Sequence, residues 1–248
     1  MSTIEYVGHA TVVVHLDGVR LITDPLLRNR VVHLRRVVPV DAKALRGLDA
    51  VLVSHAHYDH LDLPSLERLG TKLPVVVPRG LGRLLRKRRF EVVLEVEVGE
   101  TLTIGALSIR VVRAEHDRGR GPFGVSADPV GYVVEGSASV YFAGDTDLFP
   151  GMAEIGPVDV ALIPIWGWGP GLGAGHLDPE RAAEAAALLR PGRVIPIHWG
   201  TYFPIHLGLR KVPRFVEWPP SAFLAAIATT APDVPVSVLQ PGESLELE

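Results

Sequence analysis

The residues with the clearest capacity for chemistry lie in one short run of the sequence, Ser54-His55-Ala56-His57-Tyr58-Asp59-His60. Its pattern is H-x-H-x-D-H, and imidazole and carboxylate are ligand types that hold zinc and similar divalent ions. Three histidines and one aspartate within six residues are more than one tetrahedral ion can take from a short loop. The run therefore predicts two neighbouring metal ions that share the loop. A chance gathering of polar residues is the alternative, but burying three histidines without a counter-ion is costly.

The elements that must position this loop are short strands. Apolar runs separated by Gly, Pro and Asp predict strands over residues 11–14, 19–22, 50–53, 75–77, 92–94, 107–112, 130–134, 140–143, 160–163 and 194–197. Asp17-Gly18 predicts a hairpin between the first two strands, and the H-x-H-x-D-H run directly follows the third. Many short strands with few helices indicate two sheets packed face to face, with the helices outside.

Two helices are predicted in the second half of the chain. The first covers residues 180–189, with Asp178 as its N-cap and Pro179 at its first helical position, and it stops at Pro191-Gly192. The second, also preceded by proline, covers residues 221–227. No linker, repeat or change of composition divides the chain, so we expect residues 1–248 to form a single domain.

Composition narrows the classes of function. The chain has 248 residues, of which 47% are apolar and 21% charged, as in an ordinary globular protein with a substantial core. A formal charge of −3 gives no reason to expect nucleic acid as a partner. The absence of cysteine excludes thiolate metal sites and a thiol nucleophile. The N-terminal residues lack a signal-peptide pattern and no run is apolar enough to span a membrane, so we expect a cytoplasmic protein.

The H-x-H-x-D-H run resembles that of the metallo-β-lactamase-fold hydrolases, and the similarity extends beyond it. In that family the later ligands are single residues at strand ends. The matching positions here are His116 in Ala114-Glu115-His116-Asp117, Asp145 in Phe142-Ala143-Gly144-Asp145-Thr146, and His198 in Pro196-Ile197-His198-Trp199-Gly200-Thr201. A lone histidine at a strand end is more often structural, but three candidates in the family's order strengthen one another.

The resemblance implies a ligand set and a fold. One ion would be held by His55, His57 and His116. The other would be held by Asp59, His60 and His198, with Asp145 bridging both. The fold would be an α/β (α+β) four-layer αβ/βα sandwich, with the metals at the edge between two sheets. Zinc is the expected metal, and manganese and iron are the alternatives because these ligands accept all three.

Several motifs resemble one branch of this family, which contains N-acyl phosphatidylethanolamine phospholipase D and the L-ascorbate-6-phosphate lactonases. They occur in the family's order and are Gly8-His9-Ala10-Thr11, Thr23-Asp24-Pro25, Tyr58-Asp59-His60-Leu61-Asp62, Leu162-Ile163-Pro164-Ile165, His176-Leu177-Asp178-Pro179 and His198-Trp199-Gly200-Thr201. The third and the last are closer to the phospholipases. Asp117 is a departure, because the phospholipases usually carry Trp directly after the equivalent of His116.

Two metal ions imply a hydrolase that uses a hydroxide bridged between them. Asp59 and Asp145 would position this hydroxide as well as bind metal. We expect a small-molecule or lipid-derived anionic substrate, and a phosphodiester, as in the phospholipases, is the first choice. A lactonase acting on a phosphorylated sugar lactone is the second, and a non-hydrolytic di-iron redox protein is the third. A nuclease is disfavoured, because related nucleases add a clamping domain for which this length leaves no room.

Five further residues are candidates for supporting roles. Asp24 is expected to orient a ligating imidazole through its second ring nitrogen. His9 is expected to support a ligand in the same way, with direct metal binding as the less favoured alternative. His176 lies just before a predicted helix, so we expect a proton donor or anion binder, with a purely structural histidine as an equal alternative. Trp166 and Trp168 lie in a glycine-rich run and are expected to wall a substrate pocket.

Two segments are strongly basic. Residues 82–89 carry leucines at helical spacing and predict a solvated amphipathic helix, while contact with an anionic membrane surface is the less favoured alternative. Residues 26–40 are slightly favoured as an ordinary surface loop or dimer contact. Their alternative role is to roof the metal site and attract a phosphate. The sequence does not indicate an oligomeric state.

Overall fold

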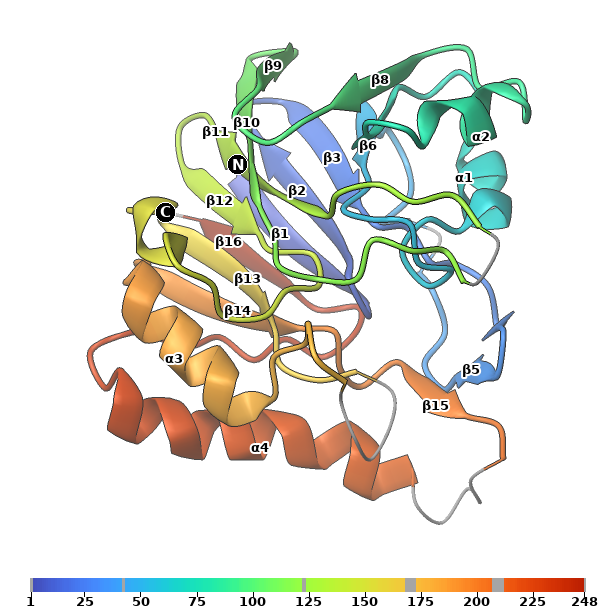
Figure 1. Ribbon diagram of the computed structural model, residues 1–248. Coiled ribbons are helices and arrows are strands. Elements are labelled where there is room, and N and C mark those ends of the chain that lie inside the picture. Colours follow the sequence, from blue (N-terminus) through green and yellow to red (C-terminus); the bar gives the residue numbers. More distant parts are fainter. Residues whose placement is uncertain (1, 42, 122–123, 168–172, 207–211, 248) are drawn as a thin grey trace.

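The computed structural model describes residues 2–41, 43–121, 124–167, 173–206 and 212–247. Two large sheets form its centre (Figure 1). The first has the order β16-β1-β2-β3-β6-β7-β8 and consists of Ser244–Leu247, Ser2–Gly8, Thr11–Leu16, Val19–Thr23, Ala50–Leu52, Val75–Pro78 and Val93–Val96. The second has the order β14-β13-β12-β11-β10-β9 and consists of Arg193–Ile197, Val160–Pro164, Ser139–Phe142, Val130–Glu135, Leu107–Arg113 and Thr101–Ile104.

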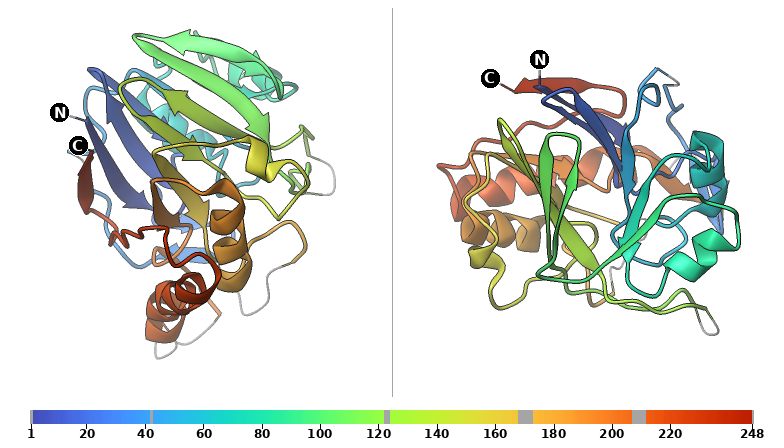
Figure 2. Two further views of the ribbon diagram at one scale, coloured as in Figure 1. Left: turned by 90° about the vertical axis from the view of Figure 1, so that its left-hand side faces the viewer. Right: turned by 90° about the horizontal axis from the view of Figure 1, so that it is seen from above.

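Helices cover the outer faces of both sheets, which gives the predicted four layers (Figure 2). Helices α1 (Leu63–Leu69) and α2 (Gly82–Arg86) lie on the first sheet, and α3 (Pro179–Leu189) and α4 (Val212–Thr230) lie on the second. A one-turn 3₁₀ helix, η1, covers Met152–Glu154. The alternation along β2 shows the layering, because Val12 and Val14 face the core between the sheets and Val13 faces the core under α1 and α2.

The direction of the strands brings the chain's functional loops to one place. In the first sheet β1, β3 and β6 run in the same direction, because β2 is antiparallel to both of its neighbours and β3 pairs with β6 in parallel. In the second sheet β10, β12 and β14 likewise share a direction. The carboxyl ends of strands that run in one direction meet at one edge of a sheet. Each sheet therefore offers at least three strand ends along that edge.

A third, small sheet lies beside this edge and was not predicted. It joins β4 (Arg30–Val31), β5 (Leu34–Arg36) and β15 (Tyr202–Pro204) in the order β15-β5-β4. Its strands are two or three residues long, too short for an alternating pattern to reveal them in the sequence.

The predicted strands and the Asp17-Gly18 turn are found at their expected places, with ends shifted by a residue or two. The helix start at Asp178 is also correct, since the Asp178 carboxylate accepts a hydrogen bond from the Arg181 backbone amide at 2.8 Å. The second predicted helix was too short. Helix α4 begins at Val212 and continues through Pro219 and Pro220, which are buried.

Tertiary packing explains why α4 continues through two prolines. Each proline removes one helical hydrogen bond, which makes proline a usual helix terminator. Phe223 and Ile227, which follow the prolines in α4, are buried in the main core. Their burial favours a continued helix despite the lost hydrogen bonds.

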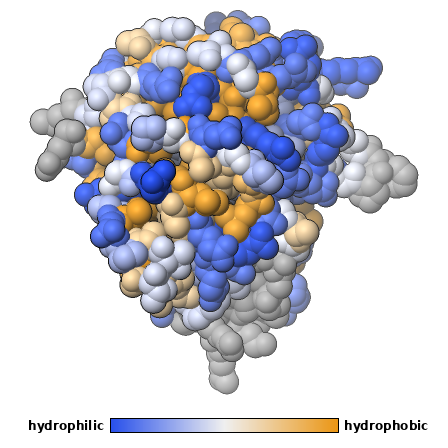
Figure 3. All heavy atoms as spheres, turned by 60° about the vertical axis from the view of Figure 1, so that its left-hand side comes forward, coloured by the Kyte–Doolittle hydropathy of each residue, from blue (hydrophilic) through white to orange (hydrophobic). Residues whose placement is uncertain are grey.

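The surface carries both apolar and hydrophilic residues. On the face shown in Figure 3, apolar residues reach the surface in patches that hydrophilic residues divide. In the segment 82–89 the helix is shorter than predicted and ends at Arg86, and Arg86 and Arg88 form ion pairs with Glu95 and Glu67 at 2.7 and 2.9 Å. Among the described residues, no helix has the length and apolarity that crossing a membrane requires.

Candidate metal centre

Six of the predicted side chains converge because each follows one of the aligned strands. In the first sheet His9 follows β1, Asp24 follows β3 and His55 comes shortly after β6, while His116, Asp145 and His198 follow β10, β12 and β14. The loop after β6 also supplies His57, Asp59 and His60. Residues as far apart in the sequence as His9 and His198 thus meet between the two sheets.

The first group of possible ligands consists of His55, His57 and His116. One ring nitrogen of each lies within 4.8 Å of the others. The His116 Nε2 atom is 3.1 Å from His57 Nδ1. The buried His55 Nε2 atom has no hydrogen-bond partner within the described part of the chain. An apolar environment would leave this nitrogen unsatisfied, and a metal ion would satisfy it.

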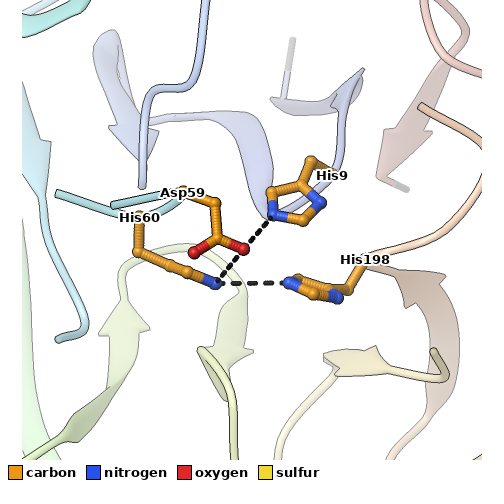
Figure 4. A group of neighbouring side chains, drawn as sticks. All are labelled: His9, Asp59, His60 and His198. Atoms are coloured by element: carbon orange, nitrogen blue, oxygen red, sulfur yellow. Dashed lines mark hydrogen bonds and ion pairs between the residues drawn. The ribbon is translucent and has the colours of Figure 1, made fainter. Parts of the chain in front are cut away.

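The second group consists of His9, Asp59, His60 and His198, which point toward one another in Figure 4. The His9 Nε2 atom lies 3.1 Å from Asp59 Oδ2, and the Nε2 atoms of His60 and His198 are 3.2 Å apart. His9 is therefore close enough to be a ligand, although the sequence favoured an indirect role. Its ring also packs on that of His198, with 3.9 Å between the ring centroids.

Asp145 lies between the two groups. Its Oδ2 atom is 3.1 Å from His60 Nε2 and 3.9 Å from His116 Nε2, while its Oδ1 atom is 3.3 Å from His198 Nε2. The side chain is almost fully buried, and Oδ1 accepts no hydrogen bond from any described residue. A carboxylate in this position can face two cations at once.

The outer ring nitrogens are held in ways that direct the inner ones toward the cluster. The outer contacts run from His55 Nδ1 to Ser54 Oγ at 2.9 Å, from His60 Nδ1 to Asp24 Oδ2 at 2.7 Å, from His116 Nδ1 to the Gly175 carbonyl at 2.6 Å, and from His198 Nδ1 to the Trp166 carbonyl at 2.7 Å. A carbonyl oxygen can only accept, so Nδ1 of His116 and of His198 donates. The Nε2 atom of a neutral ring then carries a lone pair that faces the centre, as metal binding requires.

Asp24 connects these supports. Its Oδ1 atom accepts the Ser54 backbone amide at 2.7 Å, and its Oδ2 atom accepts the Ser54 hydroxyl at 2.5 Å. The same Oδ2 atom contacts His60 Nδ1. Because the Ser54 hydroxyl donates to Asp24, it is left to accept from His55 Nδ1. One fully buried carboxylate thereby orients two imidazoles.

The neutral imidazoles and the carboxylates of the cluster favour a bound cation. Burial lowers the pKa of four imidazoles: His55, His57, His116 and His198. The pKa of His198 falls to about 3, so the ring is neutral near pH 7, which is the ligating form. For His60 burial also favours the neutral ring, but the carboxylates of Asp145 and Asp59 outweigh it and hold the pKa well above its usual value. These carboxylates thus create a place where positive charge is favoured.

The backbone is strained at three of these residues. His9, Asp24 and His198 have φ angles of 60°, 32° and 65°, in the left-handed region that costs a non-glycine residue about 1–3 kcal/mol. Long-range hydrogen bonds hold His9 and His198 there, since the His198 amide donates to the His9 carbonyl and the His9 amide donates to Thr201 Oγ1, both at 2.8 Å. Such strain is concentrated at functional sites in proteins.

His176 lies at the edge of the cluster. Its Nε2 atom is 3.8 Å from Asp145 Oδ2, and its ring packs edge-on against His116 with centroids 4.5 Å apart. The side chain is one quarter exposed, so solvent or a substrate can reach it. Trp166 lines a small hollow with His9 and His198 and packs edge-on against Trp218 at 4.9 Å. Trp168 lies outside the described residues.

A cavity of about 270 Å³ opens beside the cluster. Its polar lining includes His57, Asp59, Asp145 and His176. The turn between β4 and β5, residues 31–34, and Tyr58 line it as well. This corrects the preference for an ordinary surface loop over residues 26–40, because the segment roofs the site. The basic side chains do not line this cavity, since Arg28 pairs with Asp62 at 2.5 Å and Arg36 is buried.

A larger cavity, of about 440 Å³, is lined by other residues. Its charged residues already have partners, since Arg79 pairs with Glu97 at 2.7 Å and Arg118 pairs with Asp128. No histidine is among the residues lining it. The metal-binding chemistry therefore belongs to the smaller cavity.

Three residues that support the site were not predicted from the sequence. Ser54 could have been suspected from its place directly before His55. Thr201 has only its place in the His198-Trp199-Gly200-Thr201 motif as a signal. Arg120 has none, and its Nη1 atom donates to the carbonyls of Ala56 and Leu61 at 2.6 and 2.8 Å.

The model of the Beta-lactamase superfamily domain matches residues 19–199. The chain belongs to the metallo-β-lactamase superfamily. A UPF0173 metal-dependent hydrolase of Methanopyrus kandleri is 34% identical to it over 252 residues, which cover 98% of this chain and 99% of that protein. The N-acyl-phosphatidylethanolamine-hydrolyzing phospholipase D 1 of Caenorhabditis elegans is 32% identical over 225 residues, or 79% of this chain and 63% of the nematode protein. The chain thus spans less than two thirds of that relative.

Two solved structures have a similar fold. Igni18, a metallo hydrolase from Ignicoccus hospitalis, has a TM-score of 0.76 and 25% identity, and the match covers 100% of this chain and 99% of Igni18. CmlA, a diiron β-hydroxylase from Streptomyces venezuelae, has a TM-score of 0.75 and 21% identity over 99% of this chain and 54% of CmlA, which shows the fold alone. The predicted family and four-layer fold are confirmed. The chain is a metal-dependent hydrolase with a His/Asp cluster capable of binding metal.

Proposed function

We propose that this hydrolase binds two divalent metal ions and cleaves a phosphodiester in a small or lipid-derived anionic substrate. His55, His57 and His116 would hold one ion, Asp59, His60 and His198 the other, and Asp145 would bridge them. Zinc is the proposed metal, because imidazole-rich sites with carboxylates suit it and the chain has no thiolate. The observation that carries the proposal is the central Asp145 carboxylate, which faces ring nitrogens of both groups.

Two bound ions would lower the pKa of a shared water and polarise the scissile group. The chain's own residues would do the rest. Asp59 and Asp145 lie in the cavity wall and would orient the attacking oxygen. The exposed edge of His176 faces the same cavity, from which it would donate a proton to the leaving group or bind a phosphate oxygen.

Two observations support a phosphodiester over other substrates. The nematode relative is by name a phospholipase D, an enzyme that hydrolyses a phosphodiester. The cavity wall also places a histidine, His176, next to the carboxylates of Asp59 and Asp145, which offers both a proton donor and ligands for cations. The match to that relative covers 79% of this chain.

Elemental analysis coupled to hydrolysis of bis(p-nitrophenyl) phosphate tests the proposal, with and without added Zn²⁺ or Mn²⁺. We expect about two metals per chain and metal-dependent cleavage. His55→Ala should lower both metal content and activity. His176→Ala should keep the metal but lower kcat/KM about 10²-fold or more. His15→Ala, a change in β2 outside the site, is the matched control.

The outcomes separate the parts of the proposal. Two metals without phosphodiester cleavage would reject the phosphodiester as the substrate class and would favour a lactone instead. Absence of metal even after reconstitution would reject the binuclear centre. An unchanged kcat/KM in His176→Ala would show that this histidine has only a structural role.

A further inference from the structure

The turn between β4 and β5 presents apolar side chains to the same cavity that the carboxylates face. Val31, Val32 and Leu34 line this cavity together with Asp59 and Asp145. The hairpin has a two-residue turn, since Val31 pairs with Leu34. A cavity lined by both apolar and charged residues fits a ligand with two ends of different character.

Val32 is held in an unusual conformation. Its φ angle is 47°, in the left-handed region, where a β-branched residue is a true outlier and glycine would be relaxed. Its side chain is nevertheless 64% exposed, the largest exposure among the large apolar residues of the described chain. The position thus combines backbone strain with an isopropyl group in solvent. Neither feature contributes to stability, and strain of this kind is typical of ligand-binding positions.

The hairpin under Val32 is firmly anchored. Val31 and Leu34 are buried together with Leu26 and Tyr202 in a small core of their own. The Tyr202 hydroxyl donates to the Arg28 carbonyl at 2.5 Å. Beyond Tyr202, the Ile205 amide donates to the His33 carbonyl at 2.9 Å and holds the turn itself.

The anchor also fixes the hairpin relative to the metal centre. The Tyr202 ring contacts the His9 ring edge-on, with 5.4 Å between centroids. His9 in turn contacts Asp59. The apolar wall is therefore preformed at a set distance from the proposed metal ligands, and binding need not order it first.

We propose that the β4–β5 hairpin is an apolar subsite that makes Val32 a specificity-determining residue. The substrate would carry an alkyl chain that packs chiefly on the exposed Val32 while its anionic group faces Asp59, Asp145 and His176. This inference rests on the proposed function for the anionic end. The alkyl end is inferred from the hairpin alone.

A matched pair of substrates tests the subsite: methyl p-nitrophenyl phosphate and hexyl p-nitrophenyl phosphate. Each methylene removed from water favours binding about fourfold. We expect the metal-loaded protein to show a KM at least about tenfold lower for the hexyl ester. In Val32→Ser, which keeps Cβ but replaces the methyl groups, the KM for the hexyl ester should rise about tenfold and that for the methyl ester should stay unchanged.

Two further variants control for folding. Val32→Gly relieves the strain at φ 47° and so remains folded, and it should lose the hexyl preference as Val32→Ser does. Val98→Ser alters another valine, which is 50% exposed outside the hairpin, and should leave both KM values unchanged. Equal KM values for the two esters in the unmodified protein, or a preference that survives both Val32 variants, would overturn the proposal.

Binding measurements separate this inference from the proposed reaction. Titration calorimetry with hexylphosphonate and methylphosphonate needs no turnover. If neither ester is cleaved but hexylphosphonate binds more tightly, and Val32→Ser removes the difference, the phosphodiesterase proposal fails while the subsite stands. If the two phosphonates bind equally well to the metal-loaded protein, the subsite is refuted whatever the catalytic result.

Discussion

Asp24 illustrates how much of this site depends on residues that would not touch the metals. Its carboxylate is fully buried and contacts His60 and both polar groups of Ser54. Through Ser54 it also fixes the ring of His55. The hydrogen bonds therefore set which nitrogen of each imidazole faces the cluster, and this choice decides whether the ring can bind metal at all.

Asp24→Asn should weaken metal binding without blocking folding. The amide has nearly the shape of the carboxylate but carries no charge, and its NH₂ group cannot accept from His60 Nδ1 or the Ser54 hydroxyl. We expect the affinity for Zn²⁺ to fall about 10- to 100-fold, measured by competition with a chelator. Asp233→Asn, an exposed change, is the control. An unaltered affinity in Asp24→Asn would show that Asp24 does not orient the ligands.

At the scale of elements, the loop that follows β6 holds four predicted ligands without regular secondary structure. Arg120 stabilises it from outside by donating to the carbonyls of Ala56 and Leu61. The guanidinium also lies 4.2 Å from the centre of the Tyr58 ring. One side chain thus ties the loop after β10 to the loop after β6, which supply ligands to the same group.

Arg120→Met should loosen the metal-binding loop. Methionine keeps much of the apolar stem but loses both hydrogen bonds to backbone carbonyls, each of which a charged donor strengthens. We expect the free energy of unfolding to fall by about 2 kcal/mol and the metal to dissociate faster. Denaturant unfolding and the rate of Zn²⁺ transfer to a chelator measure the two effects. Arg118→Met is the neighbouring exposed control, and equal behaviour of the two variants would contradict the role given to Arg120.

For the whole molecule, the two sheets share one large core and the proposed ligands come from both of them. Metal binding should therefore stabilise the sandwich as a unit. Residues 1–248 are also predicted to form a single domain, and a domain with one core unfolds in one cooperative step.

Removal of metal should lower the melting temperature of a single transition. A ligand present at about a thousand times its Kd adds about 4 kcal/mol to the free energy of unfolding. For a chain of this size, each kcal/mol shifts Tm by roughly 2–4 °C. We therefore expect a chelator to lower Tm by about 10 °C, and added Zn²⁺ to restore it. Calorimetry and near-ultraviolet circular dichroism should give the same midpoint. Two separate transitions would contradict the single domain, and an unchanged Tm would contradict tight metal binding.

Acidification should destabilise the metal-free protein. Burial lowers the pKa of His55, His57, His116 and His198, the last to about 3 from its usual 6.5. Below about pH 6.5 the unfolded chain binds protons at these rings that the folded chain does not, so the free energy of unfolding decreases as pH falls. The raised pKa of His60 has the opposite effect on the free energy of unfolding, but it concerns one ring, whereas the pKa is lowered at four. Tm measured between about pH 7.5 and 4.5 should fall, and a constant or rising Tm would contradict the burial of neutral imidazoles.

The sequence alone determined the features that depend on neighbouring residues. Strands such as β10 and β11 follow from local apolar patterns, the start of α3 follows from Asp178 and Pro179, and the H-x-H-x-D-H loop reveals metal chemistry because its ligands are adjacent. The family resemblance added His116, Asp145 and His198. Their order along the chain matched the order of strand ends in the fold.

Only the tertiary structure decided what distant residues do together. It placed His9 against Asp59, brought Arg120 to the loop after β6, and turned residues 31–34 into a wall of the cavity. It also carried α4 through Pro219 and Pro220, against their local preference. The physical reason is common to these cases. Hydrogen bonds and burial that involve residues far apart in the sequence outweigh local propensity. These contacts form only when the sheets have aligned their strand ends.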